Sequence, residues 1–516
     1  VAHRHIDVGV PVQHVRPVCH SSSFALCSSS GPQILEHVRI REARVAGVWR
    51  GKAVMAPAED GQQPPLHMLF AARGVRCTIL TTPVQASIIR SIVDLSSPPI
   101  DIAVVPFPDV GLLPGTQSGS GGDHGKLQQA ARQLREPFRQ FLADHHVEID
   151  AVVSDSFFPW SLDVTAEYGV PRLAFLGTSM FARCCAESML RNDNPDDDDD
   201  DDEGDPNAVL SVPGMPHHVE LRRSQLMRHP DQLTFVKGIY AADQKSYGEL
   251  VNSFHELELG YVEHYRTTLR RRAWLVGPVA LASGSKDEAS RGTDVLSPDA
   301  DGCIPWLDAK PAGSVVYVAF GTLASFSPEQ LRELARGLDL SGKNFVWVIS
   351  GADAASSDIW MPEGFPTASR GYIIRGWAQQ VLILNHPAVG DFLTHCGWNS
   401  TLEAVSAGVP MVTWPRHADQ FFNEKLVVDV LEVGVSVGAK DYGSSMETHR
   451  VIGAEVIAGA VGTLMEVQGD AMRSRARDLG IKARSAVEKG GSSYGDAGQL
   501  VDELMARRSR QPGGGR

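Results

Sequence analysis

The residues best suited to chemistry follow a short apolar stretch, Gly390–Thr394, which predicts a buried strand. After it comes the run His395-Cys396-Gly397-Trp398-Asn399-Ser400, where a helix is expected to begin. Gly397 permits close approach of the backbone to a ligand, and a helix N-terminus offers free N–H groups and a positive dipole end to an anion. Asn399 and Ser400 are capping residue types that can also donate to phosphate oxygens, and His395 can hydrogen-bond or pair with a diphosphate. The segment therefore predicts a diphosphate-binding loop.

Other interpretations of these residues stay open. Cys396 beside the histidine could suggest a metal site, but two adjacent residues make a poor ligand pair and no further ligand spacing follows. Ser400 and Glu403 have the spacing of a capping box, so Glu403 could serve only to fix the start of the helix. Trp377 and Trp398 could be core aromatics rather than ligand contacts. The residues alone do not decide between these roles.

Composition limits the kind of protein that carries this loop. The chain has 516 residues, too many for one compact core, so we expect two domains. The net charge is -14, and the acidic run Asp196–Glu203 accounts for more than half of it. We expect this run to be a solvated loop rather than a metal site, because self-repelling carboxylates on a loop lack fixed geometry. The remaining charge forms no basic stripe, which argues against nucleic acid as a partner.

Cysteine usage and hydropathy indicate a cytoplasmic protein. The seven cysteines are odd in number and scattered, which is typical of free thiols in a reducing compartment. No stretch approaches the roughly 18 apolar residues that a membrane-spanning helix needs. We therefore expect a cytoplasmic chain without a membrane span.

Alternating strands and helices must position the loop. Apolar runs bounded by turn residues predict strands, and the helical stretches between them predict doubly wound parallel sheets. In the second half, Ser327 is expected to cap a helix that has Pro328 at its first position. The predicted strands are residues 52–58, 76–82, 100–106, 149–154, 315–320, 344–349, 372–374, 390–394 and 411–414, with helices over 66–72, 126–144 and 161–168.

The 44 residues from Trp377 to Gln420 resemble the signature box of the plant family 1 UDP-glycosyltransferases, the plant secondary product glycosyltransferase box. Trp377 opens the box, the HCGWNS run lies in its middle, and Asp419-Gln420 closes it. The resemblance extends from about residue 54 to 507. It implies an α/β fold of the GT-B type, in which two doubly wound parallel-sheet, Rossmann-like domains face each other across a cleft. Three positions depart from the pattern: Gln379 replaces a usual Pro, Asp391 a common Gly, and His417 a frequent aromatic residue.

The resemblance also implies roles for the residues of the box, with the donor bound mostly by the C-terminal half. Trp377 would stack on uracil and the backbone of Ala378 would meet its edge. Gln380 and Glu403 would bind the ribose. The diphosphate would be held by His395, Gly397, Asn399, Ser400 and Thr322, and the sugar hydroxyls would be addressed by Trp398, Asp419 and Gln420. In this family, Gln at the last position of the box, here Gln420, usually goes with UDP-glucose as the donor.

The family's catalytic pair is a His in a Gly-His-x-x-Pro turn and an Asp at the end of a later strand. Asp155 fits the second position, where a carboxylate can orient and stabilise an imidazolium; its alternative role is to cap the helix 161–168, for which it lies several residues too early. The turn Gly61-Gln62-Gln63-Pro64 places Gln62 where the His is expected, and glutamine cannot accept a proton near neutral pH. His67 and His14 are alternative bases, and a faulty N-terminal sequence is a further explanation.

The resemblance divides the chain into parts. We expect an atypical, disordered leader (1–52) and an N-terminal acceptor-binding domain (53–262) that contains an acidic disordered loop (193–205). A linker (263–305) leads to a C-terminal UDP-sugar-binding domain (306–480). A C-terminal helix (481–507) that packs back on the N-terminal domain and a disordered tail (508–516) complete the chain.

The function expected from this resemblance is an inverting hexosyl transfer. Glucose would pass from UDP-glucose to a hydroxyl of a flavonoid, phenolic, terpenoid or hormone. Because of Gln62, the alternative is a UDP-sugar-binding protein with weak or no turnover; a GT-B-shaped sugar-nucleotide epimerase is a third hypothesis. We expect a monomer whose partners are the UDP-sugar and a small-molecule acceptor, with no metal and no cofactor besides the donor substrate.

Overall fold

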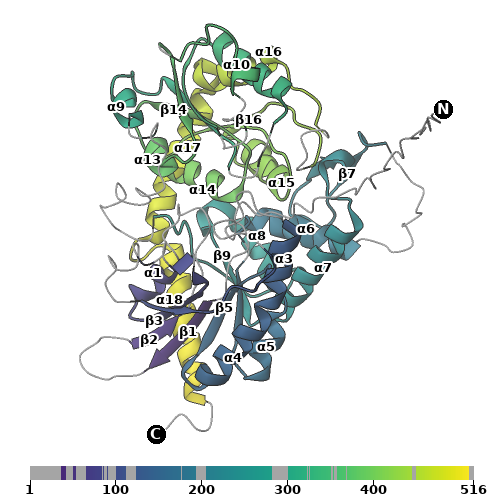
Figure 1. Ribbon diagram of the computed structural model, residues 1–516, viewed down its shortest axis with the longest axis vertical. Helices are drawn as coiled ribbons and strands as arrows, with labels where there is room; N and C mark the ends of the chain where they lie inside the picture. Colours follow the sequence, from purple (N-terminus) through teal and green to yellow (C-terminus); the bar gives the residue numbers. More distant parts are fainter. Residues whose placement is uncertain are drawn as a thin grey trace, which may run out of the picture.

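Two α/β domains make up the part of the chain that the structure, a computed structural model, describes (Figure 1). The first domain lies in the lower half of that view and the second in the upper half. The described residues are 36–41, 50–53, 66–83, 85–86, 90, 100–111, 124–175, 177–192, 205–281, 300, 302–321, 324, 326–349, 353, 357–367, 369–443 and 449–510.

The N-terminal sheet has, within the described residues, eight strands in the order β10-β9-β6-β5-β1-β3-β4, with β2 paired to β1. The neighbours β5, β6, β9 and β10 run parallel, as do β3 and β4. Parallel neighbours require crossover connections, which the helices supply. The strands are β1 (Glu36–Arg41), β2 (Arg50–Ala53), β3 (Arg76–Thr81), β4 (Asp101–Val104), β5 (Ala151–Asp155), β6 (Arg172–Phe175), β9 (Gly248–Val251) and β10 (Ala273–Leu275). The helices are α1 (Leu66–Ala71), α3 (His124–Gln133), α4 (Arg135–His145), α5 (Ser161–Glu167), α6 (Met180–Asn192), α7 (Pro230–Lys245) and α8 (His255–Thr267), and β7 (Val209–Ser211) and β8 (Glu220–Arg222) form a separate hairpin.

The C-terminal sheet has six described strands, all parallel, in the order β13-β12-β11-β14-β15-β16. Helices cover both faces, so the strand Val315–Ala319 is buried along its whole length. The strands are β11 (Val315–Ala319), β12 (Asn344–Ile349), β13 (Gly371–Arg375), β14 (Val389–Thr394), β15 (Met411–Thr413) and β16 (Gly434–Ser436). The helices are α9 (Cys303–Asp308), α10 (Pro328–Leu340), α12 (Ser357–Trp360), α13 (Gln380–Leu384), α14 (Trp398–Ala407), α15 (Gln420–Lys425), α16 (Ala454–Met465) and α17 (Asp470–Val487).

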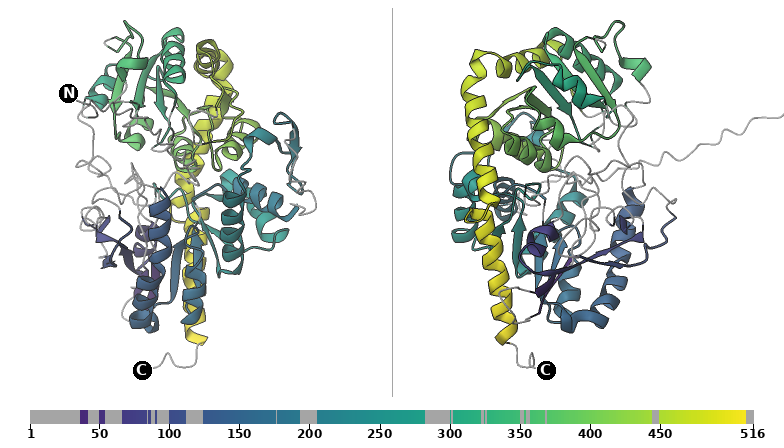
Figure 2. Two further views of the ribbon diagram at one scale, coloured as in Figure 1. Left: turned by 45° about the vertical axis from the view of Figure 1, so that its right-hand side comes forward. Right: turned by 90° about the vertical axis from the view of Figure 1, so that its left-hand side faces the viewer.

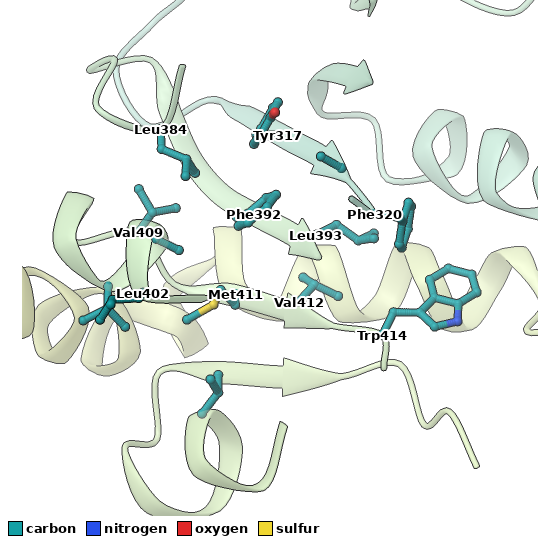
Figure 3. Close-up of a cluster of buried hydrophobic side chains, with 14 of the residues drawn as sticks. Tyr317, Phe320, Leu384, Phe392, Leu393, Leu402, Val409, Met411, Val412 and Trp414 are labelled. Carbon is teal, nitrogen blue, oxygen red and sulfur yellow. The ribbon is translucent and has the colours of Figure 1, made fainter. Parts of the chain in front are cut away.

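Side chains from the central strands form the core of this domain (Figure 3). Tyr317 of β11 stacks on Phe392 of β14 with ring centroids 5.0 Å apart. Beyond the ends of β11 and β15, Phe320 and Trp414 meet edge to face at 5.6 Å. The second contact lies just past the carboxyl ends of β11 and β15, on either side of β14, from which the predicted donor-binding loop emerges.

The helix cap predicted at Ser327 is confirmed. The Ser327 hydroxyl accepts a hydrogen bond from the Gln330 backbone N–H at 3.2 Å, and Pro328 occupies the first helical position. The Gln330 side chain does not return to the cap. It bonds both the N–H and the carbonyl of Ile452 instead, at 2.7 and 2.9 Å, and so links α10 to the segment before α16.

The start of the N-terminal domain differs from its prediction. β1 and most of β2 fall within the predicted leader 1–52, so that prediction is wrong for these strands, while the rest of the leader lies outside the described residues. β1 runs antiparallel to β2, β3 and β5, which makes the sheet mixed rather than purely parallel. The connection 42–49 between β1 and β2 is long enough for a hairpin but not for the crossover of a dozen or more residues that parallel pairing needs.

The predicted linker, residues 263–305, is also wrong at both of its ends. α8 continues to Thr267 and β10 joins the N-terminal sheet, so the first domain extends beyond residue 262, and α9 already begins at Cys303. Only three residues form β10, and its short apolar run, Ala273–Val276, stands between three arginines and the Gly277-Pro278 turn, so the sequence gives it little weight as a strand. Of the predicted acidic loop 193–205, only Asp205 lies within the described residues.

The C-terminal segment consists of two long helices rather than one. α17 contacts α14 in the second domain and α8 in the first, and α18 (Ser492–Arg510) then runs along the first domain (Figure 2, right). The predicted return to the N-terminal domain is seen in α18, where Arg508 pairs with Asp150 at 2.8 Å. Because α18 extends to Arg510, the predicted tail 508–516 starts too early, and residues 511–516 lie outside the described part.

Candidate active site

The predicted diphosphate loop joins β14 to α14. The helix begins at Trp398 with Gly397 as its N-cap, and it ends at Gly408 in the left-handed conformation, as predicted. Asn399 and Ser400 thus lie within the first turn, and no side chain caps the helix. The capping-box interpretation of Ser400 and Glu403 is therefore wrong. The first-turn N–H groups have no intrahelical acceptor and point along the positive end of the helix dipole, which suits an anion.

The His395 ring is held between two glycines. A Cβ at Gly321, where φ is +70°, would lie 2.9 Å from His395 Nε2, and a Cβ at Gly397 would lie closer still. Both positions therefore require glycine for this ring placement. Burial, and secondarily the neighbouring His417, lowers the pKa of His395 to about 3. The ring is thus neutral at physiological pH, and its Nδ1 has no hydrogen-bond partner among the described residues.

The predicted ribose-binding pair is brought together. Gln380 Nε2 donates to Glu403 Oε2 at 2.8 Å and to Ser400 Oγ at 3.0 Å. Tyr317 donates its hydroxyl to Gln380 Oε1 at 3.3 Å. These contacts place the predicted ribose residues, Gln380 and Glu403, beside the predicted diphosphate residue Ser400. Gln380 and Glu403 are 23 positions apart in the sequence. Trp377 lies half-buried just before α13.

Ala378 and Thr322 complete the predicted donor residues. Ala378 is buried, and its carbonyl accepts from the Gln380 backbone N–H at 2.9 Å. Thr322 lies outside the described residues, directly after Gly321. The structure therefore gives no position for one of the predicted diphosphate contacts.

Two of the three predicted sugar-binding residues, Trp398 and Asp419, contact the N-terminal domain. Asp419 Oδ2 accepts from Thr178 of the N-terminal domain at 2.6 Å, and burial raises the pKa of Asp419. Gln420 Oε1 accepts from the backbone N–H groups of Arg416 and His417, at 2.9 and 3.1 Å, which fixes the loop before α15. Trp398 donates its indole N–H to the Asn252 carbonyl across the domains at 2.8 Å, and its side chain is fully buried, so this N–H is already engaged.

Asp155 ends β5, as predicted, and is almost fully buried. The Phe157 N–H donates to its Oδ1 at 2.7 Å. Burial raises the pKa of Asp155 to about 7, against the effect of the Phe157 hydrogen bond, and the nearby Asp243 raises it further. The alternative role as a helix cap is excluded, because Trp160 is the N-cap residue of α5.

A buried ion network that the sequence did not reveal supports Asp155. Arg172 of β6 donates to the Asp155 carbonyl at 3.4 Å, to Ser161 Oγ at 2.7 Å and to Asp243 at 2.9 Å. Arg183 bonds the other Asp243 oxygen at 3.4 Å. A single arginine thus fixes the end of β5, the start of α5 and helix α7. Its only signal in the sequence is a charged residue at the start of an apolar strand.

The predicted positions for the base lie mostly outside the described part. Gln62 and His14 are not among the described residues, and His67 lies in α1. Thr178, Ser179 and Asn423 are additional polar residues at the site. Thr178 and Ser179 follow β6, which neighbours β5, so the adjacency of strand ends could have indicated them.

Two further properties concern the whole described part. No helix among the described residues is long and apolar enough to cross a membrane. Within the same residues, no group of three or more His, Cys, Asp or Glu side chains could hold a metal ion.

Comparison with known proteins places this geometry in a family. Residues 260–445 match the family model for UDP-glucoronosyl and UDP-glucosyl transferases. The scopoletin glucosyltransferase of Nicotiana tabacum is 40% identical over 468 residues, which cover 86% of this chain and 94% of the relative. The chain belongs to the plant family 1 UDP-glycosyltransferases.

Other members of the family agree in sequence and fold. The soyasapogenol B glucuronide galactosyltransferase of Glycine max is 38% identical, over 84% of this chain and 91% of the relative. The crystal structure of Glycyrrhiza uralensis UGT73P12, complexed with glycyrrhetinic acid 3-O-monoglucuronide, superposes with a TM-score of 0.78 at 36% identity, covering 86% of this chain and 92% of that one. Medicago truncatula UGT71G1, complexed with UDP-glucose, superposes with a TM-score of 0.69 at 28% identity, over 83% and 91%. This UDP-glycosyltransferase accordingly has the GT-B fold.

Proposed function

We propose that this UDP-glycosyltransferase transfers glucose from UDP-glucose to a hydroxyl of a small plant metabolite. The observation that carries the proposal is the set of hydrogen bonds that links the predicted donor residues: Gln380 bonds Glu403 and Ser400 in α14, and Asn423 joins Asp419 to the loop before that helix. This set offers hydrogen-bonding groups for a ribose, a diphosphate and a sugar in the order in which they occur in a nucleotide sugar. One relative is named as a scopoletin glucosyltransferase, and one similar structure is a complex with UDP-glucose. Both are consistent with this proposal.

The reaction is a direct displacement at the anomeric carbon. The acceptor oxygen forms a bond to C1 of the glucose while the bond from C1 to the diphosphate oxygen breaks, and the configuration inverts. The bonding electrons leave with UDP, whose growing negative charge is stabilised by the first-turn N–H groups of α14 and by the neutral His395 ring. The acceptor proton passes toward Asp155, whose carboxyl group is near its pKa at neutral pH.

The surroundings of Asp155 support an aromatic acceptor. Phe157, whose N–H binds the Asp155 carboxyl group, stacks with Phe235 of α7 at a centroid distance of 6.2 Å. Both rings are only partly buried, so they offer an apolar surface next to the carboxylate. Flat phenolic acceptors suit such a surface, because aromatic pairs are stabilised by offset stacking.

The test is release of UDP from UDP-glucose by the purified protein in the presence of phenolic, flavonoid and terpenoid acceptors. UDP-galactose serves as a parallel donor, because one relative is named as a galactosyltransferase. Gln62→His is assayed beside the wild type. We expect turnover with UDP-glucose and at least one phenolic acceptor; UDP binding without turnover by either protein would overturn the proposal. Faster turnover by Gln62→His would identify position 62 as the family's base position.

A further inference from the structure

Asn423 of α15 connects three separate parts of the site. Its Nδ2 donates to Asp419 Oδ2 at 3.0 Å and to the Cys396 carbonyl at 2.9 Å. Its Oδ1 accepts from the Ser179 hydroxyl of the N-terminal domain at 2.9 Å. The side chain is fully buried. A single amide therefore contacts the predicted sugar-binding carboxylate, the diphosphate loop and the opposite domain.

Two of these partners belong to strained loops. Cys396 has a φ of 64° and Ala418, next to Asp419, a φ of 55°. Residues with a Cβ rarely adopt this left-handed conformation, and it persists only where the surroundings enforce it. Asn423 bonds the Cys396 carbonyl through its side chain and the Asp419 carbonyl through its backbone N–H at 2.9 Å. It is therefore placed to hold both loops in conformations that they would not keep alone.

The partner in the N-terminal domain is itself well fixed. Ser179 precedes α6, and the preceding Thr178 donates to the same Asp419 oxygen as Asn423 does, at 2.6 Å. Buried Glu258 accepts from the backbone N–H of Phe181 at 2.7 Å and anchors the first turn of α6. The N-terminal domain thus presents two hydroxyl groups, in a fixed arrangement, to Asp419 and Asn423.

We propose that Asn423 is a positioning residue that orients Asp419 toward the donor sugar and does so only while the two domains are in contact. The inference rests on the proposed function, in which Asp419 binds sugar hydroxyls. UDP lacks the sugar, and Asn423 contacts the predicted diphosphate loop at a backbone carbonyl, that of Cys396, whereas it contacts Asp419 at the carboxylate itself. Loss of Asn423 is therefore expected to weaken binding of UDP-glucose much more than binding of UDP.

The experiment is calorimetric titration of the full-length protein with UDP and with UDP-glucose, without acceptor. We compare the wild type with Asn423→Ala and with Asn423→Asp, which keeps the shape but turns an oxygen toward Asp419. Ser179→Ala removes the bond between Ser179 and Asn423, together with the bond that the Ser179 hydroxyl accepts from the Ala182 N–H at the start of α6. Lys425→Ala is the matched control on the same helix, because Lys425 forms an ion pair with the exposed Asp429 at 3.0 Å, away from Asp419 and Cys396. None of these measurements requires turnover, so a wild type that binds both ligands but transfers no sugar would refute the proposed function and leave this test standing.

We expect both Asn423 variants to bind UDP-glucose roughly 10- to 100-fold more weakly, as for loss of hydrogen bonds to Asp419. UDP should lose several-fold less than UDP-glucose does, because it depends on the loop at Cys396 but not on Asp419. Ser179→Ala should show the same selectivity with a smaller loss, and Lys425→Ala should match the wild type. Equal losses for both ligands would show a purely structural role and overturn the proposal. Unchanged UDP-glucose binding in the Asn423 variants would overturn it as well. If Asn423→Ala fails to fold, Ser179→Ala decides between these outcomes.

Discussion

Asp391 gives the sharpest prediction about stability, because it is a carboxyl group buried in the C-terminal domain without a hydrogen bond. It lies in the centre of β14, paired with Val316 of β11, and is fully buried. Neither carboxylate oxygen has a hydrogen-bond partner among the described residues. Burial raises the pKa of Asp391 from 3.8 to about 7, although the charges of Arg473 and Lys343 act in the opposite direction.

The sign and size of the effect follow from this pKa. Because the pKa is higher in the folded than in the unfolded protein, folding favours the protonated carboxyl group. This contribution is complete below about pH 4 and is lost as the pH rises through about 7. Above pH 7, the ionised group costs about 4 kcal/mol relative to a group with an unshifted pKa, at about 1.4 kcal/mol for each pH unit between the two values. At about pH 5.5 the same relation gives about 2 kcal/mol.

The perturbation is Asp391→Asn, which keeps the shape of the side chain and removes its charge. The free energy of unfolding is measured by urea titration at about pH 5.5 and about pH 8.5. Tryptophan fluorescence is the probe, because the fully buried Trp347, Trp360 and Trp414 report on the domain that contains Asp391. We expect the stability of the variant relative to wild type to rise by about 2 kcal/mol between the two pH values. Asp478→Asn on α17 is the charge-matched control, since Asp478 is exposed.

Two results would refute this reasoning. A stability difference between Asp391→Asn and wild type that is the same at both pH values would mean that Asp391 does not titrate with a raised pKa. A difference that moves in favour of wild type at about pH 8.5 would mean that the carboxylate is compensated by a partner in the folded protein.

The remaining predictions concern the active site and its support. Activity should fall as the pH drops below about 7, because Asp155 then becomes protonated. Asp155→Asn should lose activity roughly 10²–10⁴-fold and should no longer show this fall at low pH. The same dependence of UDP release on pH in wild type and variant would contradict this role. Gly397→Ala should weaken UDP binding about 10-fold or more, because the added Cβ displaces the His395 ring, and calorimetry showing unchanged binding would contradict that geometry. Arg172→Ala should destabilise the protein by about 3–5 kcal/mol, since Asp243 loses a buried partner; a loss below about 1 kcal/mol in urea unfolding would count against it.

The features that the sequence predicts well depend on residues that are close together along the chain. Ser327 and Gly408 bound their helices as expected, because caps depend on the local backbone and one side chain. Asp155 was placed at the end of its strand by the apolar run before it. The arrangement of β14, Gly397 and α14 follows from the same local signals, and the binding of a diphosphate there stays a prediction.

The features that the sequence does not predict depend on tertiary contacts. α14 begins at Trp398 with Gly397 as its N-cap, rather than at a Ser400 cap, and the His395 ring lies too close to that glycine for a Cβ. The hydrogen bonds of Asn423 join residues up to 244 positions apart, and no periodicity in the sequence marks them. Gln62 lies outside the described residues, and its assignment to the position of the family's base stays a prediction.

The return of α18 to the first domain has a consequence for biosynthesis. β10 is the edge strand of the N-terminal sheet and is covered by α18, whose Glu503 meets Arg272 across a separation of 231 residues. At a translation rate of about 5–20 residues per second, α18 is made on the order of tens of seconds after β10 leaves the ribosome. During that interval the edge of the sheet is exposed while the whole second domain is synthesised. The nascent chain therefore has to keep an unpaired strand edge from aggregating, and chaperone demand should be highest just before the last helix emerges.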